Sequence, residues 1–133
     1  MNAADDNETL EQWFSFDRSD FARTIAHGGT REISVARVLE RVRGPLRFID
    51  LSVVEPGADI GLHTHELDNE ELYIVLSGRG WMTLDGRGFE VGPGHVILNR
   101  PGGAHALKNI GGETLRMVVI EVEASLPPLG GTA

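Results

Sequence analysis

The sequence predicts an all-β, single-domain protein that folds as a double-sheet jelly roll or small barrel. Three observations support this prediction. Short runs of β-branched, aromatic and aliphatic residues alternate with polar ones, turn signals made of Gly, Pro and Asp recur roughly every eight to twelve residues, and no convincing long helix is visible. A chain of 133 residues can bury one core but not two, and its 17 glycines fit a globular protein with many turns.

We expect roughly nine or ten short strands, separated by glycine and proline turns. The clearest strands fall at 33–42, 46–54, 72–77, 79–84, 89–91 and 114–123. The dipeptide Asp85-Gly86 is favoured in tight hairpins, so the strands on either side of it should pair. Three arginines, Arg37, Arg47 and Arg116, lie within expected strands, where charged residues usually mark the solvent face.

Composition divides the chain into three parts. Residues 1–26 form an N-terminal extension that is acidic at first and then aromatic, residues 27–124 form the barrel, and residues 125–133 are a loose C-terminal tail. The aromatic part of the extension holds Trp13, Phe14, Phe16 and Phe21. We interpret these side chains as an apolar lid on the barrel or as a dimer contact, in preference to a substrate-binding cluster.

Charge and cysteine content exclude several classes of function. The formal net charge of −8 works against binding to nucleic acid or to an anionic membrane, because either would need a basic patch. The chain has no cysteine, which excludes disulfides and thiolate metal sites. No apolar run approaches the ~20 residues that span a bilayer, and the amino terminus is acidic where a signal peptide would be basic. We therefore expect a cytoplasmic protein with a small-molecule substrate.

The stretch GADIGLHTHELDNEELYIVLSG, residues 57–78, carries the first candidate site residues. His63 and His65 are two positions apart, so on a β-strand both imidazoles project from the same face. A carboxylate follows at Glu70 or Glu71, directly before an apolar run that is typical of a buried strand. Two imidazoles and one carboxylate on neighbouring strands make three sides of a metal site.

A second stretch, GHVILNRPGGAHALKN at 94–109, can supply the missing ligand. It places His105 after a Gly/Pro turn and at the start of another short strand. Together the two stretches resemble the paired motifs of the cupin family. The first motif, Gly, five residues, His-x-His, three or four residues, Glu, six residues, Gly, is matched at Gly57, His63, His65 and Gly78. The second, Gly, five residues, Pro-x-Gly, two residues, His, three residues, Asn, is matched at Gly94, Gly102, His105 and Asn109, with Arg100 in place of the proline.

The identity of the acidic ligand depends on how the first motif is counted. Counting back from Gly78 selects Glu71, which leaves five residues after His65, one more than the motif has. Glu70 keeps that gap at four but breaks the spacing to Gly78. We favour Glu71, because period two places it on the same face as Tyr73.

The resemblance implies the double-stranded β-helix of the cupin barrel and one divalent metal ion per chain, held by His63, His65, Glu71 and His105. Three imidazoles and one carboxylate suit Zn, Mn, Fe, Ni or Co, and leave one or two positions for water or substrate. Cupins often pair, so we also expect a homodimer.

Several reactions are compatible with such a site. Our leading hypothesis is a metal-dependent enzyme of isomerase, lyase or cyclase type that acts on a small oxygenated substrate. An iron-dependent dioxygenase and a non-catalytic module that binds a sugar or carboxylate are the alternatives. The thiol dioxygenases that use a Cys-Tyr cross-link are excluded because the chain lacks cysteine.

Four further residues need an interpretation. Tyr73 is the candidate catalytic acid or base, or else a core residue with its hydroxyl at the edge. His27 is interpreted as a loop residue, with contact to a pocket as the alternative. His95 is expected in a surface turn. Arg100 is interpreted as a solvated side chain, or as a clamp on a carboxylate.

Overall fold

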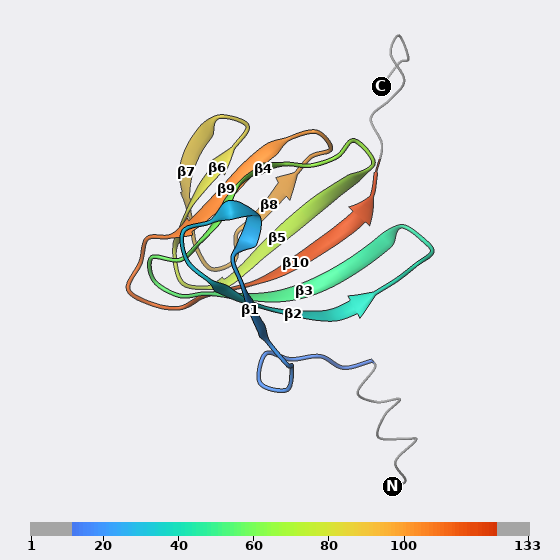
Figure 1. Ribbon diagram of the computed structural model, residues 1–133, viewed down its shortest axis with the longest axis horizontal. Coiled ribbons are helices and arrows are strands. Elements are labelled where there is room, and N and C mark those ends of the chain that lie inside the picture. The colour runs from blue at the N-terminus through green and yellow to red at the C-terminus, as the bar shows by residue number, and fades with distance from the viewer. Residues whose placement is uncertain (1–11, 125–133) are drawn as a thin grey trace, which may run out of the picture.

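The computed structural model describes residues 12–124, which fold as two antiparallel β-sheets packed face to face (Figure 1). The expected all-β fold and single domain are confirmed, since ten strands and one short 3-10 turn make up the described part of the chain. Residues 1–11 and 125–133 lie outside the described residues, and so do the expectations for the first part of the extension and for the C-terminal tail. Among residues 12–124, no helix is long and apolar enough to cross a membrane.

The larger sheet has six strands in the order β1-β2-β3-β10-β5-β8. Their bounds are β1 (Ala22–Thr24), β2 (Ile33–Glu40), β3 (Leu46–Val54), β10 (Leu115–Glu123), β5 (Asn69–Ser77) and β8 (Val96–Asn99). All neighbours in this sheet are antiparallel. Because β1 pairs with β2, the sheet begins before residue 27, where we expected the barrel to start.

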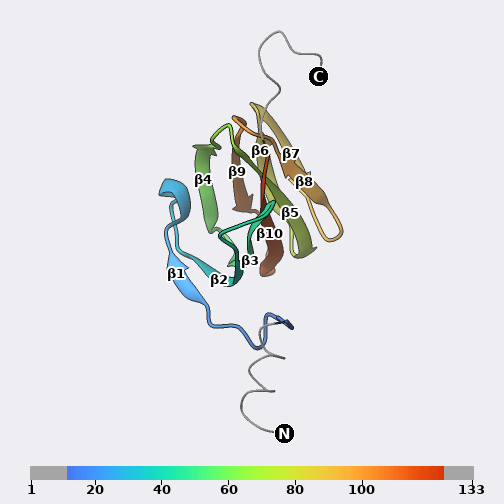
Figure 2. The ribbon, with the colours of Figure 1, turned by 90° about the vertical axis from the view of Figure 1, so that its right-hand side faces the viewer.

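The smaller sheet has four strands in the order β4-β9-β6-β7. Their bounds are β4 (Asp59–Thr64), β9 (Ala104–Asn109), β6 (Gly80–Leu84) and β7 (Arg87–Val91). The expected hairpin at Asp85-Gly86 is confirmed, because both residues have positive φ and connect β6 directly to β7. The 3-10 turn η1 (Ala26–Gly28) lies beside β4, as Figure 2 shows.

The core lies between the sheets, and strand periodicity decides which side chains enter it. On β5 the alternate residues Glu71, Tyr73 and Val75 are buried, and on β10 Met117 and Val119 are buried. The smaller sheet contributes Ile60, Met82, Val91 and Leu107 to the same cluster. Each such side chain stabilises the fold by about 1.5–3 kcal/mol when it leaves water. The alternation of β5 therefore places the polar side chain of Glu71 inside the barrel, together with Tyr73 and Val75.

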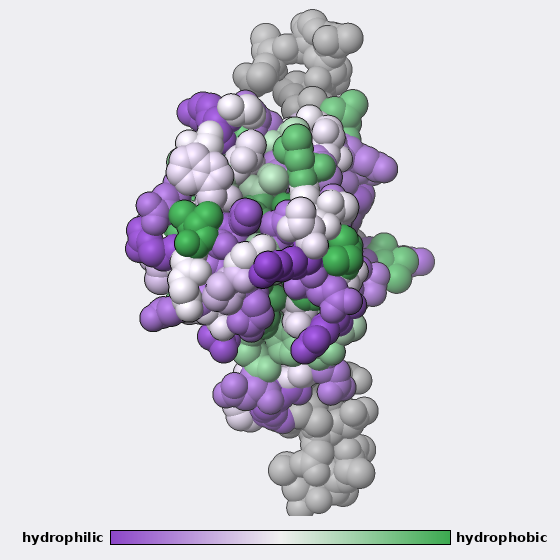
Figure 3. All heavy atoms as spheres, turned by 60° about the vertical axis from the view of Figure 1, so that its left-hand side comes forward, coloured by the Kyte–Doolittle hydropathy of each residue, from purple (hydrophilic) through white to green (hydrophobic). Residues whose placement is uncertain are grey.

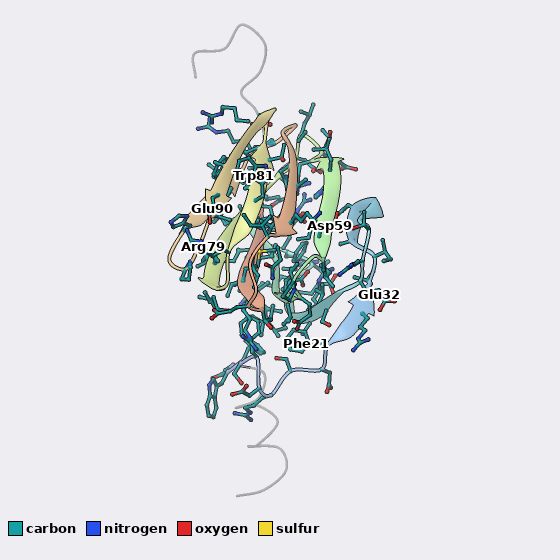
Figure 4. All side chains as sticks on the ribbon, turned by 90° about the vertical axis from the view of Figure 1, so that its left-hand side faces the viewer. Phe21, Glu32, Asp59, Arg79, Trp81 and Glu90 are labelled. Atoms are coloured by element: carbon teal, nitrogen blue, oxygen red, sulfur yellow. The ribbon has the colours of Figure 1, made fainter. Side chains whose placement is uncertain are left out.

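The outer face of the larger sheet is also apolar. Two rows of paired side chains cross β10, β5 and β8 there, Ile120, Leu72 and Leu98 in one and Val118, Ile74 and Val96 in the other. On the side of the smaller sheet the surface is mostly hydrophilic, with separate apolar patches (Figure 3). Arg79 and Glu90 form an ion pair of 2.6 Å there, and Trp81 is the strand partner of Glu90 (Figure 4). The two faces of the molecule therefore differ in polarity.

Candidate metal centre

The structure brings together the four predicted ligands. His63 on β4 pairs in register with His105 on β9, His65 follows the end of β4, and Glu71 reaches across from β5 in the other sheet. Each residue offers one ligand atom, and these atoms all lie within 4.8 Å of one another. These four residues come from both sheets, so they come together only when the two sheets have packed against each other. Such a group could hold one metal ion.

The two acidic residues left open by the sequence face opposite ways. Glu71 is 8% exposed, and its Oε1 lies 3.5 Å from His65 Nε2 and 3.6 Å from His105 Nε2. Glu70 is paired with Val122 on the outer side of the sheet. Adjacent strand residues alternate between faces, so only one of the two carboxylates can reach the histidines.

Neighbouring polar groups fix the orientation of two imidazoles. His63 Nδ1 lies 2.8 Å from the carbonyl oxygen of Gly61, and His65 Nδ1 lies 2.7 Å from Asn69 Oδ1. If each Nδ1 donates its proton to that oxygen, each Nε2 keeps a free lone pair, as metal-binding histidines require. His65 Nε2 and His105 Nδ1 are buried and have no hydrogen-bond partner among the described residues. A metal ion would satisfy His65 Nε2, so the residues fit such an ion.

The protonation states also fit a metal ion. Burial raises the pKa of Glu71, but hydrogen bonds and charge from His105 and His65 outweigh it and lower that pKa to about 2. Burial and repulsion from neighbouring imidazoles lower the pKa of His63 to about 4, against the hydrogen bond to the Gly61 carbonyl oxygen. The carboxylate of Glu71, 3.5 Å from Nε2, raises the pKa of His65. At neutral pH the carboxylate is therefore ionised and His63 is neutral, which are the forms that bind metal.

Tyr73 lies next to this group. Its side chain is 2% exposed, and its hydroxyl oxygen lies 3.0 Å from His105 Nε2, with which it shares a hydrogen bond. Burial and then the charge of Glu71 raise the pKa of Tyr73 well above its ordinary value. The phenol therefore stays protonated at neutral pH and acts as a hydrogen-bond donor or acid, whereas the role of base requires a phenolate.

A cavity of about 130 Å³ reaches this group from the side of β2 and β3. Glu71, Tyr73 and His27 line it together with Arg37 and Asp50. Arg37 binds both carboxylate oxygens of Asp50, at 2.8 and 3.1 Å. Arg37 is exposed, as expected for a charged strand residue, and its guanidinium pairs with a buried acid. A larger depression of about 430 Å³ shares Arg37 but contains none of the four clustered residues, so we place the site in the smaller one.

Three other sequence interpretations can be compared with the structure. Asn109 donates hydrogen bonds to the carbonyl oxygens of Val54 and Glu113, both at 2.8 Å, and so stabilises a turn. His95 is exposed in the expected surface turn. Arg100 is exposed as well and does not line the cavity.

Two further residues lie close to the site, His27, for which contact with a pocket was the second interpretation, and Asn99. The ring of His27 stacks on that of His63, with centroids 3.5 Å apart and planes 6° apart. Burial lowers the pKa of His27, although the charge of Glu71 opposes this, so its imidazole is neutral at pH 7. Asn99, 1% exposed, is the strand partner of Glu71, and neither of its amide atoms has a hydrogen-bond partner among residues 12–124. At His27, the only signal in the sequence was the pair of glycines that follows it.

Comparisons with known proteins agree with this architecture. Residues 50–121 match the family model described as Cupin domain. A relative in Methanocaldococcus jannaschii, an uncharacterized protein, is 39% identical over 86 residues, which are 65% of this chain and 65% of the relative. The match therefore spans less than two thirds of the relative's length. An oxalate-binding protein of Thermotoga maritima is 28% identical over 95 residues, 70% of this chain and 78% of that protein.

Solved structures show the same fold. The crystal structure of a predicted oxalate decarboxylase from Thermotoga maritima superposes with a TM-score of 0.79 at 23% identity, and covers 84% of this chain and 99% of that one. The polyketide cyclase RemF from Streptomyces resistomycificus superposes with a TM-score of 0.68 at 22% identity, over 87% of this chain and 81% of that one.

Proposed function

This chain belongs to the cupin family, and on that premise we propose that it is a metal-dependent enzyme of isomerase, lyase or cyclase type that acts on a small oxygenated molecule. One observation carries the proposal. Three imidazoles and an ionised carboxylate converge within 4.8 Å, and the carboxylate lines a cavity that has the neutral hydroxyl of Tyr73 in its wall. A binding site with only a structural metal would not need a protonated phenol beside its ligands.

His63, His65, Glu71 and His105 would hold one divalent ion, for which Zn, Mn, Fe, Ni and Co are all compatible with the donor set. When bound, the ion supplies Lewis-acid polarisation of a carbonyl or carboxylate oxygen. The chain supplies the remaining functions. Asn69 and the Gly61 carbonyl hold two imidazoles in place, and the barrel core excludes bulk water from the buried side.

Tyr73 has the role of proton donor in this proposal. Its hydroxyl shares a hydrogen bond with His105 Nε2, and that nitrogen could not take part in this hydrogen bond if it held a metal ion. The hydroxyl must then find another acceptor, and a substrate oxygen in the shared cavity would provide one. Its raised pKa keeps the phenol protonated at neutral pH, so it can donate to a substrate oxygen but cannot act as a base.

Substrates that carry a carboxylate are the favoured class. The cavity contains the cationic side chain of Arg37, although Asp50 already occupies two of its donors. The relatives named as an oxalate-binding protein and as a predicted oxalate decarboxylase are consistent with such a substrate. The first name also supports the second candidate function, a non-catalytic module that binds a small carboxylate.

Turnover of candidate substrates by the metal-loaded protein tests the proposal. Oxalate and a panel of small hydroxy acids would be followed by NMR, in air and without oxygen. We expect oxygen-independent conversion of at least one compound, and a loss of about 10²–10⁴-fold in rate for Tyr73→Phe with its metal retained. Binding without conversion would favour the binding module, and conversion that needs oxygen would favour an iron-dependent dioxygenase.

We also propose that the protein is a homodimer that buries the outer face of its larger sheet. On this face Val96 is 62% exposed, and the half-buried Leu72 and Ile74 lie beside it. Light scattering should give about twice the monomer mass of 14.5 kDa, and Ile74→Glu should return it to the monomer. Trp81→Glu, on the opposite face, is the matched control. A wild-type mass near 14.5 kDa at micromolar concentration would exclude this dimer.

A cytoplasmic location stays a prediction.

A further inference from the structure

His27 reaches the centre from outside the barrel motifs, on a turn that is fixed to the strand carrying His63. A Cβ at Gly61 on β4 would overlap the carbonyl oxygen of His27, so only glycine there lets the turn lie this close. Just after the turn, the backbone N–H and the hydroxyl of Thr30 both donate to Asp59 Oδ1, at 2.7 and 2.8 Å. Asp59 lies on the same strand, near η1 (Figure 4). Contacts with Gly61 and with Asp59 therefore hold the turn against β4.

The backbone of His27 is strained. Its φ of 51° and ψ of 42° lie in the left-handed region, which costs a residue other than glycine about 1–2 kcal/mol. A conformation of this kind persists only where its surroundings compensate. The compensation here is the contact with β4 and the flat stack of the imidazole on His63 at 3.5 Å. Strain stored at a residue beside a candidate site is a reason to examine that residue for function.

The stacking geometry excludes one role for His27. The lone pair of an imidazole nitrogen lies in the plane of the ring. The planes of His27 and His63 are parallel to within 6° and are stacked, so an ion in the plane of His63 lies outside the plane of His27. In agreement, the four ligand atoms within 4.8 Å of one another do not include one from His27. A fifth ligand is therefore not what this arrangement provides.

His27 does line the cavity together with Glu71 and Tyr73. We propose that His27 is a ligand-binding residue whose imidazole edge hydrogen-bonds an oxygen or nitrogen atom of the small anion bound at the centre. The inference rests on the proposed function, and it adds that the η1 turn completes the binding site. Packing against His63 alone would need only a flat ring, and a phenylalanine provides one. The polar edge is therefore the property to test.

The experiment uses the full chain loaded with Co(II), whose visible spectrum reports on molecules bound at the metal. Oxalate and azide are titrated into the wild type, His27→Phe and His27→Asn. The phenylalanine keeps the stack without the polar edge, and the asparagine tolerates the left-handed backbone but is shorter. His95→Asn, in an exposed turn, controls for loss of a histidine.

We expect all four proteins to bind about one cobalt per chain. Both His27 variants should bind oxalate about tenfold to a hundredfold more weakly than the wild type, as expected for the loss of a hydrogen bond to a charged ligand. His95→Asn should match the wild type. Equal affinities for both anions in His27→Phe and the wild type would overturn the inference, and so would loss of cobalt from His27→Phe.

The two anions separate this inference from the proposed function. If the wild type binds azide in a manner that depends on His27 but does not bind oxalate, the carboxylate substrate class is wrong and the inference stands. If neither anion changes the cobalt spectrum of the wild type, no position is open beside His27, and both proposals are wrong.

Discussion

Replacement of Glu71 by glutamine should weaken metal binding strongly, because it removes the single negative charge of the proposed ligand set. Glutamine keeps the size of the side chain and one carbonyl oxygen, so the packing between β5 and β9 is little changed. The carboxylate is 8% exposed and lies within 3.6 Å of two imidazole nitrogens, where water screens its charge poorly.

The pKa of Glu71 gives the magnitude. A pKa lowered from its ordinary 4.5 to about 2 means that the folded site favours the ionised form by about 3 kcal/mol. A divalent cation should gain at least as much from the same charge as the imidazole groups do. A loss of about 3 kcal/mol corresponds to a dissociation constant about a hundredfold larger.

Competition with a chromophoric zinc chelator at pH 7.5 measures this change directly. Glu70→Gln is the matched control, since it removes the same charge one residue away on the opposite face of β5. It should change the affinity by less than about twofold, as expected for a distant, screened charge. An affinity of Glu71→Gln within a few-fold of the wild type, or an equal loss in both variants, would refute this assignment of the ligand.

The remaining predictions concern stability and pH. Gly61→Ala should lower the free energy of unfolding by about 1–3 kcal/mol in urea denaturation because its Cβ overlaps the η1 turn, whereas Gly112→Ala, with open space around it, should have little effect. Asn99→Leu should stabilise the metal-free protein by about 1 kcal/mol, because it removes a buried amide without partners, and destabilisation would mean that the amide has a partner. Zinc affinity should rise as pH increases from 6.5 towards 8, since the raised pKa of His65 keeps a competing proton bound above 6.5; a flat profile would exclude such competition.

The pH dependence of the stability of the metal-free protein follows from His65 and Glu71. The pKa of His65 is raised, so its stabilising contribution is fully present below 6.5 and is lost as pH rises through the folded-state pKa. The pKa of Glu71 is lowered, so its contribution is present above 4.5 and is lost as pH falls towards 2. Thermal denaturation of the wild type and Glu71→Gln should therefore converge at low pH.

Local pattern was enough to predict most of the fold and the four clustered residues. His63 and His65 are two apart on one strand, so their shared face follows from strand geometry alone. The choice of Glu71 over Glu70 follows from the same alternation, and the structure agrees with it. The resemblance to cupins is confirmed by the family match over residues 50–121.

Residues whose role depends on distant partners could not be predicted. His27 follows no strand pattern, so contact with a pocket was only its second interpretation, and its position over His63 depends on Gly61, 34 positions further along the chain. Arg37 is exposed as expected, but its pairing with the buried Asp50 on the neighbouring strand was not predicted. In both cases a contact between segments decides where the side chain lies, and sequence periodicity does not contain that information.

Metal analysis of the purified protein tests the central claim most directly. The wild type and the variants His65→Ala and His105→Ala would be purified identically, loaded with one equivalent of Zn(II), desalted and measured by mass spectrometry of the metal. We expect about one zinc ion per chain in the wild type and most of it lost in each variant, because three donors leave the coordination sphere incomplete. Full retention of zinc in both variants, or none in the wild type, would contradict the proposed metal centre.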